Sequence, residues 1–181
     1  MNFTYELPVG QGHMFGTNMG RVPNAFLGGW QVNGSFTKRS GFPSDISGPG
    51  YSTTQYCRCA LRPNLKPGGN INPVIGELDH WFDESQFTVV PAGYFGNVGK
   101  NTLSGPGLAK FDFSVFKTAP VGEGKNLQFR AEVFNLANHP IFGGPGTSVF
   151  DTTGLLTANP GRITRTVSPS RQIQLALKFE F

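Results

Sequence analysis

The stretch Arg171–Phe181 constrains the fold most strongly, because its apolar and polar residues alternate without a break. The apolar row consists of Ile173, Leu175, Leu177, Phe179 and Phe181, and the polar row of Gln172, Gln174, Ala176, Lys178 and Glu180. A period of two is the period of a β-strand, so one face of this strand is apolar and the other polar. The apolar face needs either a protein core or lipid. A barrel strand crosses a bilayer, tilted, with about 9–11 residues, and this stretch has that length and pattern.

The composition favours strands joined by irregular loops. Gly (25 residues) and Pro (14 residues) are abundant, while charged residues make up only 14% of the chain. No apolar run approaches the roughly 18 residues of a membrane-spanning helix. The net charge of +4 comes from scattered Lys and Arg, which does not indicate a nucleic-acid partner. We therefore expect an all-β protein.

Four earlier stretches show the same alternation as the last one. They are Asn2–Pro8, Leu27–Ser40, Leu108–Thr118 and Lys125–Leu136. The four connections between the five stretches are, in chain order, medium, very long, short and long. The two long ones are residues 44–107 and 137–170, and the short one is Ala119–Gly124. Up-and-down barrels have short turns at one rim and long loops at the other. The chain is thus predicted to be an antiparallel meander of about five strands, a fragment of a large outer-membrane β-barrel with residues 44–107 and 137–170 extracellular.

The alternation also predicts which side chains face lipid and which face the barrel lumen. The predicted lipid-facing residues are Trp30, Val32, Phe36, Phe111, Phe113, Leu127, Phe129, Val133, Ile173, Leu175 and Leu177. The predicted lumen-facing rows include four charged residues, namely Lys110, Asp112, Arg130 and Glu132. Trp30 and Tyr5 are further candidates for an aromatic girdle at the membrane surface, although core packing in a soluble sandwich would use them equally well.

The short turn predicts that the third and fourth stretches form an antiparallel hairpin. Facing residues then have numbers with a constant sum, and a sum of 242 sets Lys110 opposite Glu132 and Asp112 opposite Arg130. The neighbouring even sums bring like charges together. Each facing pair of opposite charges contributes about 0.2–1 kcal/mol, so we expect this charge ladder on the lumen side.

Short segments spread along the chain resemble, in the same order, segments of TonB-dependent outer-membrane receptors. The segments are Gly29–Gly34, Ser40–Pro43, Arg62-Pro63-Asn64, Trp81-Phe82-Asp83, Phe95-Gly96-Asn97, Gly105-Pro106-Gly107 leading to Asp112, Leu127–Glu132 with Phe134-Asn135, Asn138-His139-Pro140 and Arg171–Gln174. The most similar group is the Oar-like receptors, which carry a carboxypeptidase-regulatory-like domain.

This resemblance implies that residues 1–181 are the carboxy-terminal part of a receptor barrel in the outer membrane of Gram-negative type. Such a barrel has 22 strands and a plug, and it takes up a ligand with energy delivered by the TonB system. The implied partners are outer-membrane lipid, the remainder of the barrel and the plug. Neither the plug nor an energy-coupling box is present in this sequence, so we expect the fragment alone to be inactive in transport.

The end of the chain resembles the signal that outer-membrane proteins present to the barrel-assembly machinery. The matching residues are Gln174, Ala176, Phe179 and Phe181, and the family usually has Gly where Ala176 stands. The resemblance implies that the assembly machinery is a further partner. An ordinary amphipathic last strand is the alternative.

The reactive side chains do not indicate an enzyme. Cys57 and Cys59 are expected to be either a loop disulfide or two free thiols, because a zinc site needs more ligands than are nearby. Asp79, His80, Asp83 and Glu84 form the densest acidic cluster, which we interpret as a solvated loop rather than a calcium site. We therefore predict no catalytic residues, no metal and no cofactor.

A second function class fits the same alternation. A soluble extracellular β-sandwich, acting as a carbohydrate-binding or adhesion module, would also bury one apolar face of each strand. The two hypotheses differ in whether lipid or a second sheet covers that face.

Overall fold

The computed structural model describes residues 1–48, 61–91 and 94–181. The chain forms two compact units. The first, here called the sheet unit, comprises Met1–Lys38, Ala109–Pro140 and Pro169–Phe181. The second, here called the loop unit, comprises Arg39–Leu108 and Ile141–Ser168, and thus contains most of the two segments expected as long loops.

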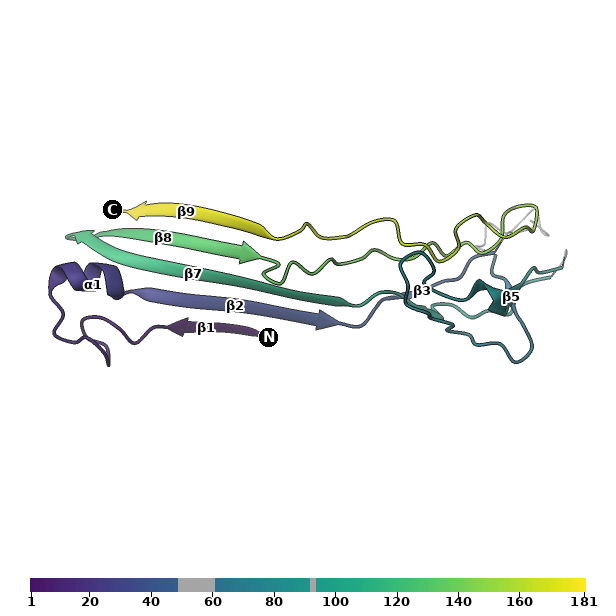
Figure 1. Cartoon of the computed structure of the whole chain (residues 1–181), viewed down its shortest axis with the longest axis horizontal. Helices are drawn as coiled ribbons and strands as arrows, with labels where there is room; N and C mark the ends of the chain where they lie inside the picture. Colours follow the sequence, from purple (N-terminus) through teal and green to yellow (C-terminus); the bar gives the residue numbers. More distant parts are fainter. Residues whose placement is uncertain (49–60, 92–93) are drawn as a thin grey trace. The chain divides into compact units, whose positions relative to one another are not determined.

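The sheet unit contains one five-stranded antiparallel sheet (Figure 1). Its strands are β1 (Asn2–Glu6), β2 (Trp30–Arg39), β7 (Leu108–Gly122), β8 (Lys125–Phe134) and β9 (Gln172–Glu180). The spatial order β1-β2-β7-β8-β9 follows the sequence order. The prediction of an all-β, up-and-down meander of five strands is therefore confirmed, and β1 and β9 form the two edges.

A short helix ends at Leu27, where the second strand was expected to begin. Helix α1 spans Arg21–Leu27, and β2 begins only at Trp30. Pro23 lies in the first turn of α1, where its missing N–H costs no hydrogen bond. Gly29 follows the helix with a φ of 70°, a conformation that favours glycine and that turns the chain into β2.

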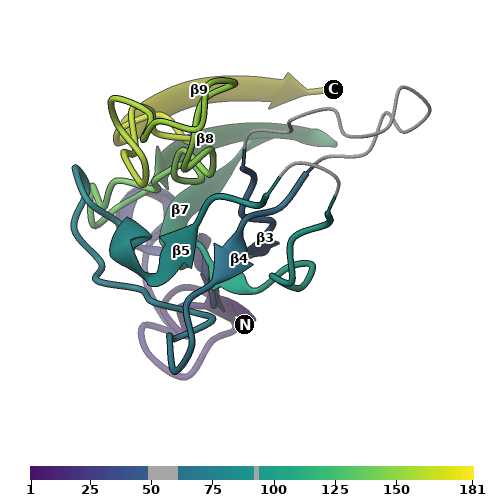
Figure 2. The ribbon, with the colours of Figure 1, turned by 90° about the vertical axis from the view of Figure 1, so that its right-hand side faces the viewer.

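The loop unit has short strands and a core of its own. Strand β3 (Pro43–Ser44) pairs with β6 (Leu103–Ser104), and β4 (Asn64–Leu65) pairs with β5 (Phe87–Thr88), which follows the 3₁₀ helix η1 (Glu84–Gln86) (Figure 2). The buried cluster consists of Ile46, Phe82, Phe87, Val98, Leu103, Val149 and Phe150. The two long connections therefore fold into one packed body, which the Gly- and Pro-rich sequence did not reveal.

Backbone hydrogen bonds tie the two connections of the loop unit together. The amide of Ser47 donates to the carbonyl of Thr147 over 2.9 Å, and the amide of Val149 donates to the carbonyl of Ser47 over 2.9 Å. Further along, the amide of Trp81 donates to the carbonyl of Gly161 over 3.1 Å. These contacts bridge segments that are 80 to about a hundred residues apart in sequence, so each connection supports the fold of the other.

The sheet unit, by contrast, buries no hydrophobic side chain among the described residues. Every buried hydrophobic residue of the described part of the chain belongs to the loop unit. A β-sandwich would bury one face of the sheet against a second sheet. Here the apolar face of the sheet is left open, and no helix in the described part of the chain is long and apolar enough to cross a membrane.

We expect the 181-residue chain, expressed alone, to aggregate or to need detergent. The exposed apolar rows and the unpaired edges of β1 and β9 both favour association, because uncovered sheet edges pair with other chains. Size-exclusion chromatography with and without detergent, combined with thermal melting followed by circular dichroism, measures this. A soluble monomer that melts cooperatively in plain buffer would contradict the expectation.

Candidate functional site

The two faces of the five-stranded sheet are the candidate functional surfaces of this chain. Residues of β8 and β9 pair so that their numbers always sum to 306, an even number that keeps odd-numbered residues opposite odd-numbered ones. Leu127 faces Phe179, and Phe129 faces Leu177. Because side chains alternate between faces, an even sum places both apolar rows on the same side of the sheet.

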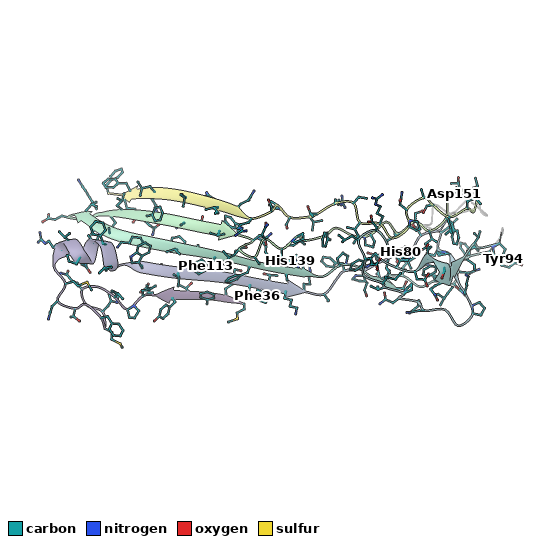
Figure 3. All side chains as sticks on the ribbon, viewed as in Figure 1. Phe36, His80, Tyr94, Phe113, His139 and Asp151 are labelled. Atoms are coloured by element: carbon teal, nitrogen blue, oxygen red, sulfur yellow. The ribbon has the colours of Figure 1, made fainter. Side chains whose placement is uncertain are left out.

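The apolar side of the sheet continues across all five strands. Tyr5 of β1 faces Val32 of β2, and Phe3 faces Gly34, whose missing side chain leaves the space that the Phe3 ring fills. Phe36 of β2 and Phe113 of β7 are labelled in Figure 3. The apolar rows contain Phe3, Tyr5, Trp30, Val32, Phe36, Phe111, Phe113, Val115, Leu127, Phe129, Ala131, Val133, Ile173, Leu175, Leu177 and Phe179. We call this side the apolar face.

The apolar face is exposed as well as continuous. Ile173, Leu175 and Leu177 are each at least 66% exposed, although they form the regular apolar row of β9. Burial of apolar surface is worth about 25 cal/mol per Å², so a face of this size left in water would be strongly unfavourable. The apolar face therefore needs lipid or further protein packed against it.

The opposite side of the sheet is polar but not uniformly so. Lys110 and Asp112 form an ion pair of 2.7 Å along the same strand. The guanidinium of Arg130 lies over the ring of Phe116 at 4.8 Å from the ring centroid, a cation–π contact. Phe116 and Phe134, which interrupt the polar rows in the sequence, thus serve as partners for the long cationic side chains.

The predicted charge ladder is wrong in its register, although the polar rows do share a face. Glu132 pairs with Ser114, and Arg130 pairs with Phe116, so that β7 and β8 pair with a sum of 246 rather than 242. Lys110 consequently does not face Glu132, and Asp112 does not face Arg130. The modest attraction between facing charges did not decide the register.

The turn between β7 and β8 decides the register of this hairpin instead. Residues Glu123 and Gly124 form a two-residue turn between the paired Gly122 and Lys125, and Gly124 has a φ of 68°. This turn alone would impose an odd sum, which would set the polar row of one strand beside the apolar row of the other. A bulge between Pro120 and Gly122 absorbs one residue and restores the even sum.

Asn135, directly after β8, is the buried polar residue of the sheet unit. Its side chain is 2% exposed, and its backbone has a φ of 54°. The side-chain amide donates to the carbonyl of His139 over 3.0 Å and to that of Pro169 over 3.4 Å, and its oxygen accepts from the His139 amide over 3.0 Å. The backbone amide of Asn135 donates to Asp112 over 2.8 Å. Asn135 therefore joins β7 through its backbone amide, and it joins the segment that leads into β9 through its side chain.

The segments that resemble the receptor family have structural contacts inside the loop unit. The side chains of Asn64 and Asn97 join two segments, because the Leu65 amide donates to Asn97 over 2.7 Å and the Asn97 amide donates to Asn64 over 3.0 Å. The indole of Trp81 donates to the carbonyl of Ser104 over 2.8 Å. These side chains hold the loop unit in shape.

The acidic cluster of the loop unit is used for internal bonds. Asp79 pairs with Arg162 at 3.0 Å, and His80, labelled in Figure 3, lies 3.3 Å from Glu84. Asp83 caps η1, and hydrogen bonds from Ser85 and then Gln86 lower the pKa of its carboxyl. The described residues contain no group of three or more side chains arranged to hold a metal. Cys57 and Cys59 lie outside the described residues.

The end of β9 leaves the residues of the predicted assembly signal accessible. The rings of Phe179 and Phe181 stack with centroids 6.0 Å apart, and both are exposed. Ala176 faces Arg130, and Gln174 faces Glu132. The role of these four residues as a signal stays a prediction.

Comparison with known proteins gives one match. The family model described as an outer membrane beta barrel domain matches residues 1–174. No curated protein and no solved structure matches the chain. The matched range covers the loop unit, strands β1, β2, β7 and β8, and the first three residues of β9.

We expect Asn135→Ala to destabilise the folded protein by about 2–4 kcal/mol. The change removes the side-chain bonds to the backbone of His139 and Pro169, and it leaves a residue with a side chain in a left-handed conformation. Urea unfolding in detergent, followed by tryptophan fluorescence, measures the loss.

Asn135→Gly separates the two causes of that loss. Glycine tolerates the left-handed backbone but cannot make the amide bonds, so this variant should recover only about 1 kcal/mol of the loss. Asn126→Ala, in β8, is the matched control and should stay within about 0.5 kcal/mol of the unchanged protein. Equal stability of all three variants would show that the Asn135 bonds do not matter.

Proposed function

The chain belongs to the outer membrane beta barrel domain family, and from that premise we propose that it forms part of the barrel of a TonB-dependent receptor that binds a ligand and takes it up with coupled energy. Its location is the outer membrane. The apolar face of the sheet supplies the surface that such a location requires. The alternative of a soluble sandwich module does not agree with this location.

The polar side of the sheet carries the argument for a large barrel with a lumen. In membrane barrels, residues alternate between lipid and an interior, and that interior is polar where the barrel is wide. Here the polar side presents Lys110, Asp112, Arg130, Glu132 and Lys178. Five strands cannot enclose such a row, so a lumen needs further strands beyond the two edges. We infer that the remainder of a receptor barrel and its plug complete the pore.

The lengths of the connections set the orientation that we propose. Outer-membrane barrels have short periplasmic turns and longer extracellular loops. The two-residue turn Glu123–Gly124 then lies on the periplasmic side, and the loop unit lies outside the cell. A packed loop unit with exposed aromatic residues such as Tyr94 and Phe95 is suited to ligand contact. The role is binding and gating, and no bond-making step or cofactor is part of it.

Two measurements test the receptor proposal in cells that make the protein. An antibody against the loop unit should detect, in outer-membrane fractions, a polypeptide far larger than the 19.6 kDa of this chain, with a plug in the same polypeptide as shown by peptide mass spectrometry. Cells lacking the gene should also fail to deplete at least one solute of the medium that parent cells deplete. A protonophore should abolish the same depletion, because the uptake depends on inner-membrane energy. Detection of the 19.6 kDa species alone, or depletion that neither change affects, would contradict the proposal.

We further propose that the barrel-assembly machinery recognises Gln174, Ala176, Phe179 and Phe181. Their support is the accessible end of β9, the edge strand that offers unpaired backbone groups. Deletion of Phe181 from the protein in its own membrane should lower its outer-membrane level several-fold on immunoblots. Deletion of Ala158, an exposed residue of the loop unit, is the control and should leave the level nearly unchanged. Equal levels in both variants would argue against recognition.

A further inference from the structure

Lys117 interrupts the apolar face. It shares the odd-numbered row of β7 with Phe113 and Val115, and it pairs with Phe129 of β8. Phe129 in turn faces Leu177 of β9. A cationic side chain in an otherwise apolar row that faces lipid is unfavourable unless its charge reaches a polar partner.

The ammonium group of Lys117 has neutral partners only. Its nitrogen lies 5.6 Å from the centroid of the Trp30 ring and donates to the carbonyl of Gly28. Among the residues that the structure describes, no carboxylate lies within ion-pair distance of it. The side chain therefore reaches along the sheet toward α1 and carries an uncompensated positive charge there.

The end of the sheet around Lys117 has the features of a membrane–water boundary. In the aligned registers, two residue levels, those of Thr118 and Ala119, separate Lys117 from Pro120 and the bulge at the turn. The indole N–H of Trp30 donates to the carbonyl of Phe26 over 2.9 Å. An indole with its ring on an apolar face and its N–H bonded to a helix end is typical of the interfacial region.

Helix α1 extends this surface. Val22 and Phe26 are four positions apart, and both are at least 70% exposed. Residues four apart lie on the same side of a helix. The backbone carbonyl of Phe26 accepts from the Trp30 indole, so the end of this helix lies beside Trp30. Lys125, on the same row of β8 as Leu127, adds a second cation at this end.

We propose that Lys117 and Trp30 form a binding site for the phosphate of an anionic phospholipid headgroup in the leaflet at the short-turn end of the sheet. The anion compensates the charge of Lys117, and its acyl chains lie along Phe129 and Leu177. A zwitterionic headgroup brings its own cation and compensates that charge less well. The site goes beyond the proposed receptor function, because it concerns the lipid side of the barrel and not the ligand.

The test uses Trp30 as a local reporter in the full chain. The chain has two tryptophans, so Trp81→Phe leaves Trp30 alone. The protein is reconstituted into vesicles in which a fixed fraction of either phosphatidylglycerol or phosphatidylcholine carries bromine on its acyl chains, which quenches only nearby indole. The quenching ratio of the two lipids reports which headgroup is enriched beside Trp30.

We expect phosphatidylglycerol to be enriched about fivefold, the factor that one basic residue contributes at an anionic surface. Lys117→Gln should reduce the ratio to about one, and Lys117→Arg should retain most of it. High salt should lower the ratio, because the contact is electrostatic.

Lys178→Gln is the matched control. Lys178 faces Gln128, which also faces Thr118, so it lies one residue level from Lys117 but on the polar side of the sheet. This variant removes the same charge at nearly the same depth and should leave the ratio unchanged. Circular dichroism in vesicles checks that each variant has the same strand content. A ratio of one in the unchanged protein, an unchanged ratio in Lys117→Gln, or an equal loss in Lys178→Gln would overturn the proposal.

Discussion

The structure depends on the parity of its strand register. Every backbone group that crosses a bilayer needs a hydrogen-bond partner, and a sheet provides one only with neighbouring strands in place. The sheet also has to keep every apolar row on the same side. Strands β8 and β9 meet this condition along their whole paired length, whereas β7 and β8 meet it only because a bulge corrects their turn. A shift by one residue would carry polar side chains into lipid and apolar ones into water.

Much of the sheet was predictable from the sequence, because alternation is a local signal. The five strands, their order and the sides of their apolar rows all follow from period-two patterns such as that of Ile173, Leu175 and Leu177. The register of the hairpin was not predictable by the same means. Facing charges differ by small energies, while the bulge beside Gly122 depends on backbone geometry that Gly-rich turns leave open. The partners of Lys117 were equally hidden, because its row reads as apolar in the sequence and because they come from β2 and from Gly28, the residue after α1.

The fold of the loop unit was even less predictable from the sequence pattern than the register of the hairpin. Residues such as Ile46, Phe82 and Val149 are isolated hydrophobic positions in Gly- and Pro-rich sequence, and no periodicity marks them as a core. Their burial depends on contacts between distant segments. The short segments that resemble receptor sequences were predictable as a family signature, but their contacts were not. Asn64 with Asn97, and Trp81 with Ser104, are pairs that only the three-dimensional structure brings together.

The interlocked backbone of the loop unit also determines when that unit can form. Ser47 bonds Thr147 and Val149, so about a hundred residues of chain, including the hairpin of β7 and β8, separate the partners. Contacts between such distant positions close late, since chain entropy opposes them until the intervening strands are in place. In the orientation that we propose, the first connection lacks Val149 and Phe150 of its core until residues 141–168 have followed it out of the cell. For that interval the hydrophobic side chains of the connection are open to proteases and chaperones, and completion of the β8–β9 connection ends the exposure.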